Sequence, residues 1–375
     1  MTTLPPHLYT ALGLERGVEP DALRRASVER ARLQEQGAYP LLSLGQLAQE
    51  TGASYRYLRE VVSRARDPYQ SIAIPKATGG TRAISAPEPM LMDVQRWILT
   101  HLLDRLPGHP ASYAYRTGFS IVACAEQHVG ARWMVKMDLH NFFGTVTESA
   151  VYRVFRRVGF SKLMSFELAR ITTRAEGAVY APWLVPERVI ASYSSFRQGV
   201  LPQGGPTSGE LANAAARRLD RLIERHARAV GLTYTRYSDD MVFSSFSEFS
   251  RPEAAQVIRD VSGLIRRAGF IPHRNKSRVV PPGARRIVLG LLVDDSVRLL
   301  PESRRRIEVH LRGCETFGLA NHALHRGFDS VFSFVNHLDG WISFALGVER
   351  ERGSEWRRRF NQVLEHAGLP LLQAQ

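Results

Sequence analysis

The stretch LTYTRYSDDMVFSS, residues 232–245, indicates two β-strands joined by a tight turn at Ser238 and Asp239. Two adjacent carboxylates, Asp239 and Asp240, therefore lie on a hairpin turn, where their negative charges repel at close range. A bound divalent cation would remove that cost. Successive side chains of an extended backbone point to opposite faces, so a metal site would need a third carboxylate from elsewhere. Without that third group, an Asp-Asp pair is more typical of a solvated turn.

Asp138 is the candidate for the third carboxylate, because it lies near the end of the largely apolar segment WMVKMDL, residues 133–139. The segment predicts a strand, and Lys136 shares a face with Asp138 by the two-residue period. An aspartate is awkward in a core but suits the rim of a sheet that faces a site. Nucleotidyl transfer needs two Mg²⁺ ions about 4 Å apart, held by carboxylates and phosphates. Asp138 and Asp239 together would bridge such a pair of ions.

The composition favours a folded protein with a nucleic-acid partner. Of the 375 residues 44% are hydrophobic, and the net charge of +14 favours a polyanion as partner. A basic protein without a specific partner is the alternative. The two cysteines, Cys124 and Cys314, make neither a disulfide framework nor a zinc site, which suits a reducing interior. The sequence has no apolar N-terminal leader and no apolar run of about 18 residues, so we expect a soluble cytoplasmic protein without a membrane partner.

Helical patterns dominate residues 1–67, where apolar spacing over residues 43–64 predicts a helix, a turn at Thr51-Gly52 and a second helix. Such a pair of helices is one way to read DNA. We favour a helical hairpin packed on the rest of the chain, because the pattern is short. Residues 69–87 predict two strands around a turn at Gly79-Gly80.

The rest of the chain mixes helices and strands without a strict βαβ rhythm, which favours the α+β class. Capping boxes at Thr207–Glu210 and Ser250–Glu253 predict the starts of two helices, and residues 287–293 predict a further strand. From residue 301 the chain is predicted to be helical and basic, with arginine triplets at 304–306 and 357–359 that we expect to contact nucleic acid. Three helices have predicted inward faces: Leu91, Val94, Ile98 and Leu102 in the first, Leu211, Ala215, Leu219 and Leu222 in the second, and Val257, Val261, Leu264 and Ala268 in the third.

Three segments in this order, KMDLHNFFGTV at 136–146, LPQGGPTSGELANA at 201–214 and RYSDDMVFSS at 236–245, resemble the metal, substrate and catalytic-turn motifs of bacterial reverse transcriptases. IPKATGGTRAISAP at 74–87 is similar to that family's fingers, and PHRNKSRV at 272–279 to the end of its palm. Ordered motifs of this kind make a chance match improbable. The resemblance implies a right-hand polymerase fold. It predicts a helical region at 1–67, fingers and palm at 68–300, and a helical thumb at 301–375.

The resemblance also implies a catalytic site. Asp138 and Asp239 would bind both metal ions, with Asp240 beside them, and Mg²⁺ is the expected cofactor with Mn²⁺ as an alternative. Lys276 matches a lysine that would donate a proton to the pyrophosphate leaving group. A surface lysine that binds phosphate is the alternative for Lys276.

The nucleotide would be bound by residues outside the carboxylates. Phe143 would lie under the sugar and exclude a ribose 2′-hydroxyl, whereas its alternative role is a core aromatic. Gln203 and Gly204 would contact the incoming nucleotide and the template base. Lys76 and Arg82, on the predicted fingers strands, would neutralise triphosphate charge. Solvated surface charge is the alternative for this pair.

Within the family, the stretch at 201–214 looks most like retron enzymes, and two retron motifs are present in part. The usual Asn-Ala-x-x-His is represented by Cys124 to His128, with the Asn replaced, and the usual Val-Thr-Gly by Val288 to Gly290, with the Thr replaced. We expect His128 and Gly290 to take part in RNA recognition. Their structural alternatives are a hydrogen-bonded histidine beside a packed cysteine, and a close-packed strand glycine.

A retron resemblance implies that the enzyme binds its own structured non-coding RNA. It would start synthesis from a guanosine 2′-hydroxyl, consume dNTPs and produce a branched RNA-linked single-stranded DNA. Retrons commonly serve phage defence with a separate effector protein. Two alternatives stay open: another defence-associated reverse transcriptase, and a non-enzymatic nucleic-acid-binding scaffold that uses the helices at 43–64 as its reader.

Overall fold

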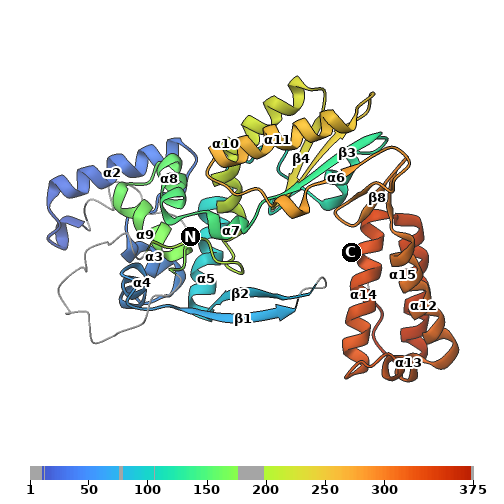
Figure 1. Cartoon of the computed structure of the whole chain (residues 1–375). Helices are drawn as coiled ribbons and strands as arrows, with labels where there is room; N and C mark the ends of the chain where they lie inside the picture. The colour runs from blue at the N-terminus through green and yellow to red at the C-terminus, as the bar shows by residue number, and fades with distance from the viewer. Residues whose placement is uncertain (1–10, 12, 76–78, 105, 176–197, 373–375) are drawn as a thin grey trace. The chain divides into compact units, whose positions relative to one another are not determined.

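Helices and antiparallel strands are interspersed along the chain, as the α+β prediction requires (Figure 1). The computed structural model describes residues 11, 13–75, 79–104, 106–175 and 198–372. The chain forms two compact units. Unit 1 comprises Met1–Thr117, Asp138–Ile223 and Asp260–Arg274, and unit 2 comprises Gly118–Met137, Glu224–Arg259 and Asn275–Gln375.

Unit 1 begins with α2 (Pro20–Glu35), α3 (Leu44–Thr51) and α4 (Tyr55–Val62). Ser43 and Ser54 cap α3 and α4 by accepting hydrogen bonds from backbone N–H groups, and Gly52 ends α3 with a positive φ of 74°. The predicted pair of helices therefore forms. Its apolar side chains are buried, and α4 packs on α9 (Lys162–Thr172), in agreement with a packed helical hairpin.

The predicted strand pair is β1 (Tyr69–Pro75) and β2 (Thr81–Pro87), antiparallel with Tyr69 opposite Pro87 and Pro75 opposite Thr81. α5 (Pro89–Ile98) follows and continues as the π-helix η1 (Leu99–Leu103). The predicted stripe of α5 is confirmed, because its four members are all buried: Leu91, Val94, Ile98 and Leu102.

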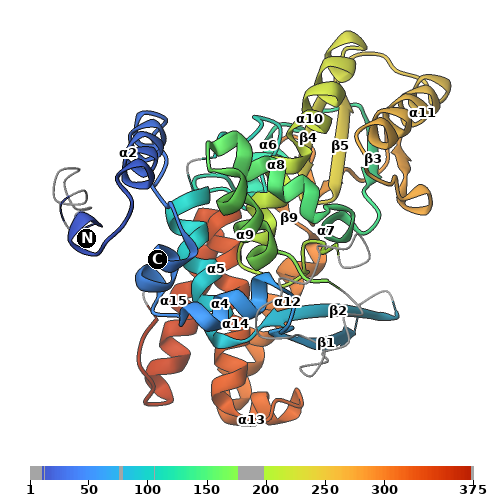
Figure 2. The same cartoon turned by 90° about the vertical axis from the view of Figure 1, so that its left-hand side faces the viewer.

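The later helices of unit 1 are α7 (Phe142–Thr145), α8 (Glu148–Val158), α9 and most of α10 (Ser208–Ala229), and α8 packs beside α9 (Figure 2). The predicted capping box at the start of α10 was wrong: Thr207 Oγ1 is buried and makes no hydrogen bond with any described residue. The predicted face of α10 was also partly wrong. Its fully buried apolar side chains are Leu211, Ala212, Ala216, Leu219, Ile223 and Ala227, whereas Ala215 and Leu222 are half-buried.

Unit 2 contains a sheet with the strand order β4-β5-β3-β6. The strands are β3 (Trp133–Asp138), β4 (Thr233–Tyr237), β5 (Asp240–Ser245) and β6 (Arg278–Val280). The predicted hairpin at 232–245 is confirmed, with Tyr237 paired to Asp240 across the turn. α6 (Ile121–Glu126) also belongs to unit 2, whereas α11 (Arg251–Arg267) and the 3-10 helix η4 (Arg274–Lys276) have residues of both units. The predicted capping box of α11 forms between Ser250 and Glu253. In the predicted face of α11, Val257 and Val261 are buried, while Leu264 and Ala268 are half-buried.

The single strand predicted at 287–293 is instead a hairpin of β7 (Ile287–Val288) and β8 (Leu291–Val293), followed by β9 (Val297–Leu299). Leu289 and Gly290 form its two-residue turn with φ of 49° and 79°. Positive φ at both positions matches the twist of flanking strands. Gly290 is therefore a turn residue. The close-packed strand role predicted as its alternative was wrong, because a Cβ added there would meet nothing within 4 Å.

The chain from residue 301 is helical, as predicted, with α12 (Pro301–Phe317), α13 (Leu319–His325), α14 (Val331–Val348) and α15 (Arg350–His366). α15 packs on α12 and α14, and α13 lies at one end of α12 (Figure 1). Their shared core includes Ile307, Leu311, Phe334, Leu338 and Trp356. In the described part of the chain, none of the helices has the length and apolarity needed to cross a bilayer.

Element boundaries lie close to the predicted domain limits. β1 begins at Tyr69, just after residue 67, and α12 begins at Pro301, just after β9 ends at Leu299. The division into a helical region, fingers with palm, and thumb stays a prediction.

Candidate active site and nucleotide-binding residues

Asp138 is the last residue of β3 and is only 4% exposed. The backbone around it is held by residues 271–273: His273 N–H donates to the Asp138 carbonyl at 2.7 Å, and His140 N–H donates to the Ile271 carbonyl at 2.7 Å. The strand end that carries the carboxylate is therefore fixed by backbone hydrogen bonds on both sides.

Asp239 and Asp240 occupy the turn and the first position of β5. Ser238 has a positive φ of 58°, and its carbonyl accepts a hydrogen bond at 2.8 Å from Arg236, whose side chain is fully buried. Lys136 on β3 lies within electrostatic reach of Asp240, although burial is the main effect on Lys136 and lowers its pKa. The turn thus places two acidic residues beside a buried guanidinium and near a half-buried amine.

His128 lies inside unit 2 with its ring fully buried. Its Nδ1 lies 2.6 Å from Ser244 Oγ, and its Nε2 lies 2.7 Å from Thr235 Oγ1. Cys124 is buried beside it and donates to Thr235 Oγ1 at 3.4 Å. The expected packed cysteine with a hydrogen-bonded histidine is therefore confirmed. A role of His128 in RNA recognition stays a prediction, and it would have to act through β4 and β5 because the ring is enclosed.

The three aspartates offer the oxygen ligands that Mg²⁺ prefers. By their contacts Asp138 belongs to unit 1, whereas Asp239 and Asp240 belong to unit 2. Within the described ranges, no group of three or more His, Cys, Asp or Glu side chains forms an arrangement that could hold a metal ion. The donor chemistry fits a hard divalent cation.

Phe143 lies on the short helix α7 and is half-buried, whereas its neighbour Phe142 is 3% exposed. The ring of Tyr115 lies 6.0 Å from that of Phe143, and Tyr115 itself is 47% exposed with a positive φ of 59°. A Cβ added at Gly209 would lie 2.4 Å from the Tyr115 ring, so glycine at 209 leaves room for it. Sequence reasoning missed Tyr115, because only tertiary packing brings it to Phe143.

Gln203 and Gly204 lie against strand β2. Ser85 N–H donates to the Gln203 carbonyl at 2.7 Å. Gly204 has a φ of 125°, and a Cβ there would lie 2.8 Å from Ile84 Cγ2 and 2.9 Å from the Ser85 carbonyl oxygen. Only glycine fits this approach. Arg82, three residues before Ser85 on β2, is exposed. Unit 1 thus brings three of the predicted nucleotide-binding residues to one strand.

Arg174 strengthens this arrangement and was not predicted. Its guanidinium bonds Asp67 at 2.8 Å and the hydroxyls of Ser71 and Ser85 at 2.9 Å each. Its backbone exchanges two 2.9 Å hydrogen bonds with Val200, shortly before Gln203. Arg174 therefore links β1 and β2 to the chain that leads into the substrate motif. No local sequence signal marks it, because its partners lie far apart along the chain.

The remaining predicted site residues are Lys276, Lys76 and Gly290. Lys276 lies exposed on η4 in unit 2. Lys76 falls outside the described residues. Gly290 lies in the β7–β8 turn, as described above.

The members of the two arginine triplets differ in their exposure and in their partners. Arg304 pairs with Glu349, and Arg357, 5% exposed, bonds Asp339 and Ser343. Arg359 pairs with Glu315 at 2.8 Å and Glu308 at 3.0 Å. Arg305 and Arg358 are exposed. Arg304, Arg357 and Arg359 are engaged in ion pairs within unit 2. That the triplets carry part of the nucleic-acid contact stays a prediction.

Comparisons with known proteins place this chain in a family. A family model described as reverse transcriptase (RNA-dependent DNA polymerase) matches residues 74–300. The retron Mx162 reverse transcriptase of Myxococcus xanthus is 34% identical over 74% of this chain, and the retron Mx65 reverse transcriptase of the same organism is 32% identical over 78%. The chain spans 58% and 64% of the lengths of these two relatives.

One more retron enzyme and one solved structure are also similar to this chain. The retron Ec86 reverse transcriptase of Escherichia coli is 27% identical over 85% of this chain and 88% of its own length. Among solved structures, telomerase from Candida albicans in complex with a fragment of telomeric RNA gives a TM-score of 0.43 at 11% identity, covering 81% of this chain and 58% of that chain.

Proposed function

Because the chain belongs to the reverse transcriptase family, we propose that it is an RNA-directed DNA polymerase of the retron type. The observation that carries the proposal is the family match over residues 74–300, which includes the end of β3 with Asp138 and the turn with Asp239 and Asp240. The curated relatives named retron reverse transcriptases support the class.

Reverse transcriptases use divalent metal ions, and we propose Mg²⁺ for this chain, with Mn²⁺ as an alternative. Bound ions would activate the primer hydroxyl and neutralise the triphosphate. Asp138 and Asp239 would hold the pair of ions, and Asp240 would assist them. The hydrogen bond from buried Arg236 to the Ser238 carbonyl would keep the turn in position for that task. Lys276 would donate a proton to the departing pyrophosphate.

The nucleotide would bind along β2 and α7. Phe143 would lie under the sugar and exclude a 2′-hydroxyl, while Gln203 and Gly204 would contact the nucleotide and the template base. The tight approach of Gly204 to Ser85 supports a fixed position for that contact. Lys76 and Arg82 would neutralise the triphosphate.

The proposed substrate is a structured non-coding RNA that serves as template and primer. The product would be a branched single-stranded DNA linked to RNA. We further propose that the enzyme works in the cytoplasm, in phage defence, with a separate effector protein. A defence-associated reverse transcriptase of another type would make DNA without the branch.

The polymerase proposal is tested by primer extension with the purified full chain. A DNA primer annealed to an RNA template should be extended with dNTPs in Mg²⁺, and EDTA should stop the reaction. A matched reaction with the primer annealed to nothing controls for terminal addition. A folded protein that binds the primer-template but adds no nucleotide in either Mg²⁺ or Mn²⁺ would favour the non-enzymatic scaffold instead.

A further inference from the structure

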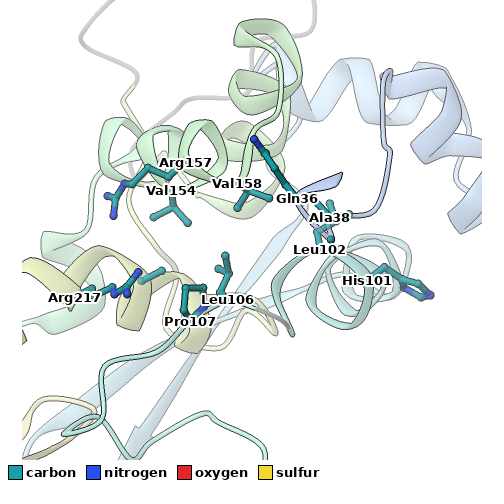
Figure 3. Close-up of a pocket in the computed structure, with 12 residues that line it drawn as sticks. Gln36, Ala38, His101, Leu102, Leu106, Pro107, Val154, Arg157, Val158 and Arg217 are labelled. Carbon is teal, nitrogen blue, oxygen red and sulfur yellow. The ribbon is translucent and has the colours of Figure 1, made fainter. Parts of the chain in front are cut away.

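Unit 1 contains a pocket of about 280 Å³ that none of the proposed catalytic or nucleotide-binding residues lines (Figure 3). Its walls come from the loop after α2, from η1 and the residues that follow it, and from α8 and α10. Apolar side chains form much of the lining, among them Leu102, Val154 and Ala214. The pocket is a feature separate from the polymerase site, and its function does not depend on the polymerase proposal.

Two arginines line one side of this pocket. Arg157 of α8 and Arg217 of α10 lie on the same side, with Val154 close to Arg157 (Figure 3). Arg153 lies one turn before Arg157 on α8, and Arg221 lies one turn after Arg217 on α10. Partial burial lowers the pKa of Arg157, and the positive charges of Arg153, Arg217 and Arg221 lower it further. Arg157 and Arg217 therefore repel each other at the pocket, and Arg153 and Arg221 lie within electrostatic reach of Arg157.

The lining of the pocket offers Arg157 and Arg217 no carboxylate partner. The residues that line the pocket include no aspartate and no glutamate. Across the ranges that the structure describes, none of the four arginines forms an ion pair with a carboxylate, in contrast to Arg304 and Arg359 of unit 2. Like charges held together without a counterion create a strong local positive potential, which attracts an anion.

The shape and the charge together select the class of anion. Guanidinium groups bind phosphate through paired hydrogen bonds, which makes arginine pairs suited to phosphate groups. The apolar walls beside them would take a flat, weakly polar group. At about 280 Å³ the pocket lies just below the size of typical ligand sites, roughly 300–1,000 Å³, so it suits one small molecule or one residue of a polymer. RNA is recognised mainly through unpaired nucleotides that leave the stack and enter such pockets.

We propose that this pocket binds a single nucleotide, with its phosphate on Arg157 and Arg217 and its base against Leu102, Val154 and Ala214. The nucleotide is an unpaired residue of a bound RNA or a free nucleoside monophosphate. In the first case the pocket is a second RNA contact, outside the polymerase site, that helps to select a folded RNA.

Three variants of the full chain test the proposal. Arg157→Gln/Arg217→Gln removes the two charges while keeping polar side chains. Ala214→Leu fills the pocket without changing charge. Arg266→Gln/Arg267→Gln is the matched control, because both arginines are exposed at the end of α11 and the change in net charge is the same. Melting temperatures establish that each variant is folded.

The measurements are the affinities for a labelled single-stranded RNA octamer and for adenosine 5′-monophosphate, over a range of salt concentrations. The charge variant should bind the octamer about 10-fold more weakly than the control. The slope of its log affinity against log salt concentration should be smaller in magnitude by about 1–2. Ala214→Leu should weaken binding with the salt slope unchanged. If a variant loses only octamer binding, the bound nucleotide is a residue of RNA. If it loses binding of both ligands, the pocket also accepts the free nucleotide.

Two results would overturn the proposal. One is a charge variant that binds both ligands as tightly as Arg266→Gln/Arg267→Gln, because the charges would then have no ligand. The other is an Ala214→Leu variant with unchanged affinity for both ligands, because the arginines would then act as an open basic surface rather than as a pocket. Neither result depends on polymerase activity, so failure here is distinguishable from failure of primer extension.

Discussion

At the scale of single residues, a substitution of Asp239 gives the most direct test of the proposed metal site. Asp239→Asn removes one negative charge from a half-buried turn without changing side-chain size. Nucleotide addition should fall by about 100-fold or more, as expected for loss of a positioned charge in an active site. The melting temperature should change little, because asparagine occupies the same space as aspartate and leaves no cavity.

Asp295→Asn is the matched control for this change, because Asp295 is an exposed aspartate of the same unit. Primer extension by both variants gives the comparison. Extension by a folded Asp239→Asn protein at the rate of Asp295→Asn would remove Asp239 from the catalytic set.

Phe143 should determine the choice of sugar. Phe143→Ala opens the space beside the Tyr115 ring, which lies 6.0 Å away. Incorporation of ribonucleotides relative to deoxyribonucleotides should rise by roughly 10–100-fold, the discrimination that steric packing provides. The ratio of the two kcat/KM values measures it, with Phe317→Ala as the control because Phe317 is 65% exposed in unit 2. An unchanged ratio would assign Phe143 to packing alone.

His128 should couple stability to pH. Burial, with a smaller effect of Lys136, lowers its pKa to about 4 in the folded chain, against about 6.5 in an unfolded one. The unfolded chain therefore binds the proton first, so this contribution to stability is present above pH 6.5 and is lost as the pH falls toward 4. His128→Gln should lose less stability between pH 7 and pH 5 than the wild type, by about 1–2 kcal/mol. Equal losses in thermal melts at the two pH values would contradict the enclosed, neutral ring.

At the scale of elements, the sequence predicted what depends on local pattern and failed where tertiary packing decides. The hairpin at 232–245 and the capping box at Ser250 follow local rules, and both are present. The turn at Leu289-Gly290 was missed because Leu289 adopts a positive φ, which an apolar side chain rarely does. Continuous apolar character from 287 to 293 therefore suggested one strand where the chain makes a hairpin.

The arginine triplets are a second case in which tertiary packing, rather than local sequence, decides the role of each residue. Consecutive residues on a helix point in different directions, so a triplet cannot act as a single surface. Arg357→Gln should lower the melting temperature, because Arg357 is 5% exposed and its loss leaves Asp339 without this partner. It should leave the salt dependence of RNA binding unchanged.

Arg305→Gln/Arg358→Gln should do the reverse, because both side chains are exposed. The slope of log affinity against log salt concentration should fall by about 1–2, with little change in melting temperature. Thermal melts and salt titrations of the two proteins side by side provide the measurement. A reduced slope in Arg357→Gln together with an unchanged slope in the double variant would contradict this assignment.

At the scale of the whole molecule, the order of the motifs was enough to predict the family and the candidate carboxylates, because catalytic residue types are restricted by their chemistry. Contacts that join distant segments were not predictable from one sequence. Tyr115 beside Phe143, Arg174 on β1 and β2, and the pocket with Arg157 and Arg217 all arise from the fold.

The retron proposal makes its prediction about the product of the whole molecule. A chain with a net charge of +14 can hold many phosphates, but charge alone does not choose one RNA. Choice requires contacts to unpaired nucleotides and 2′-hydroxyls of a folded RNA. If such a fold presents an internal guanosine 2′-hydroxyl to the carboxylates, the first nucleotide is joined to it. The DNA then carries a 2′–5′ branch to its own template.

Expressing the chain with the DNA that precedes its reading frame should therefore yield single-stranded DNA that keeps a short RNA stump after ribonuclease treatment. A debranching enzyme should shift that DNA to a faster mobility on a denaturing gel. Cells with Asp239→Asn should contain the RNA but none of the DNA, which ties the product to this active site. DNA that is made by the wild type but is insensitive to debranching would place the chain among other defence-associated reverse transcriptases, because the polymerase would then be active without the priming step that defines a retron.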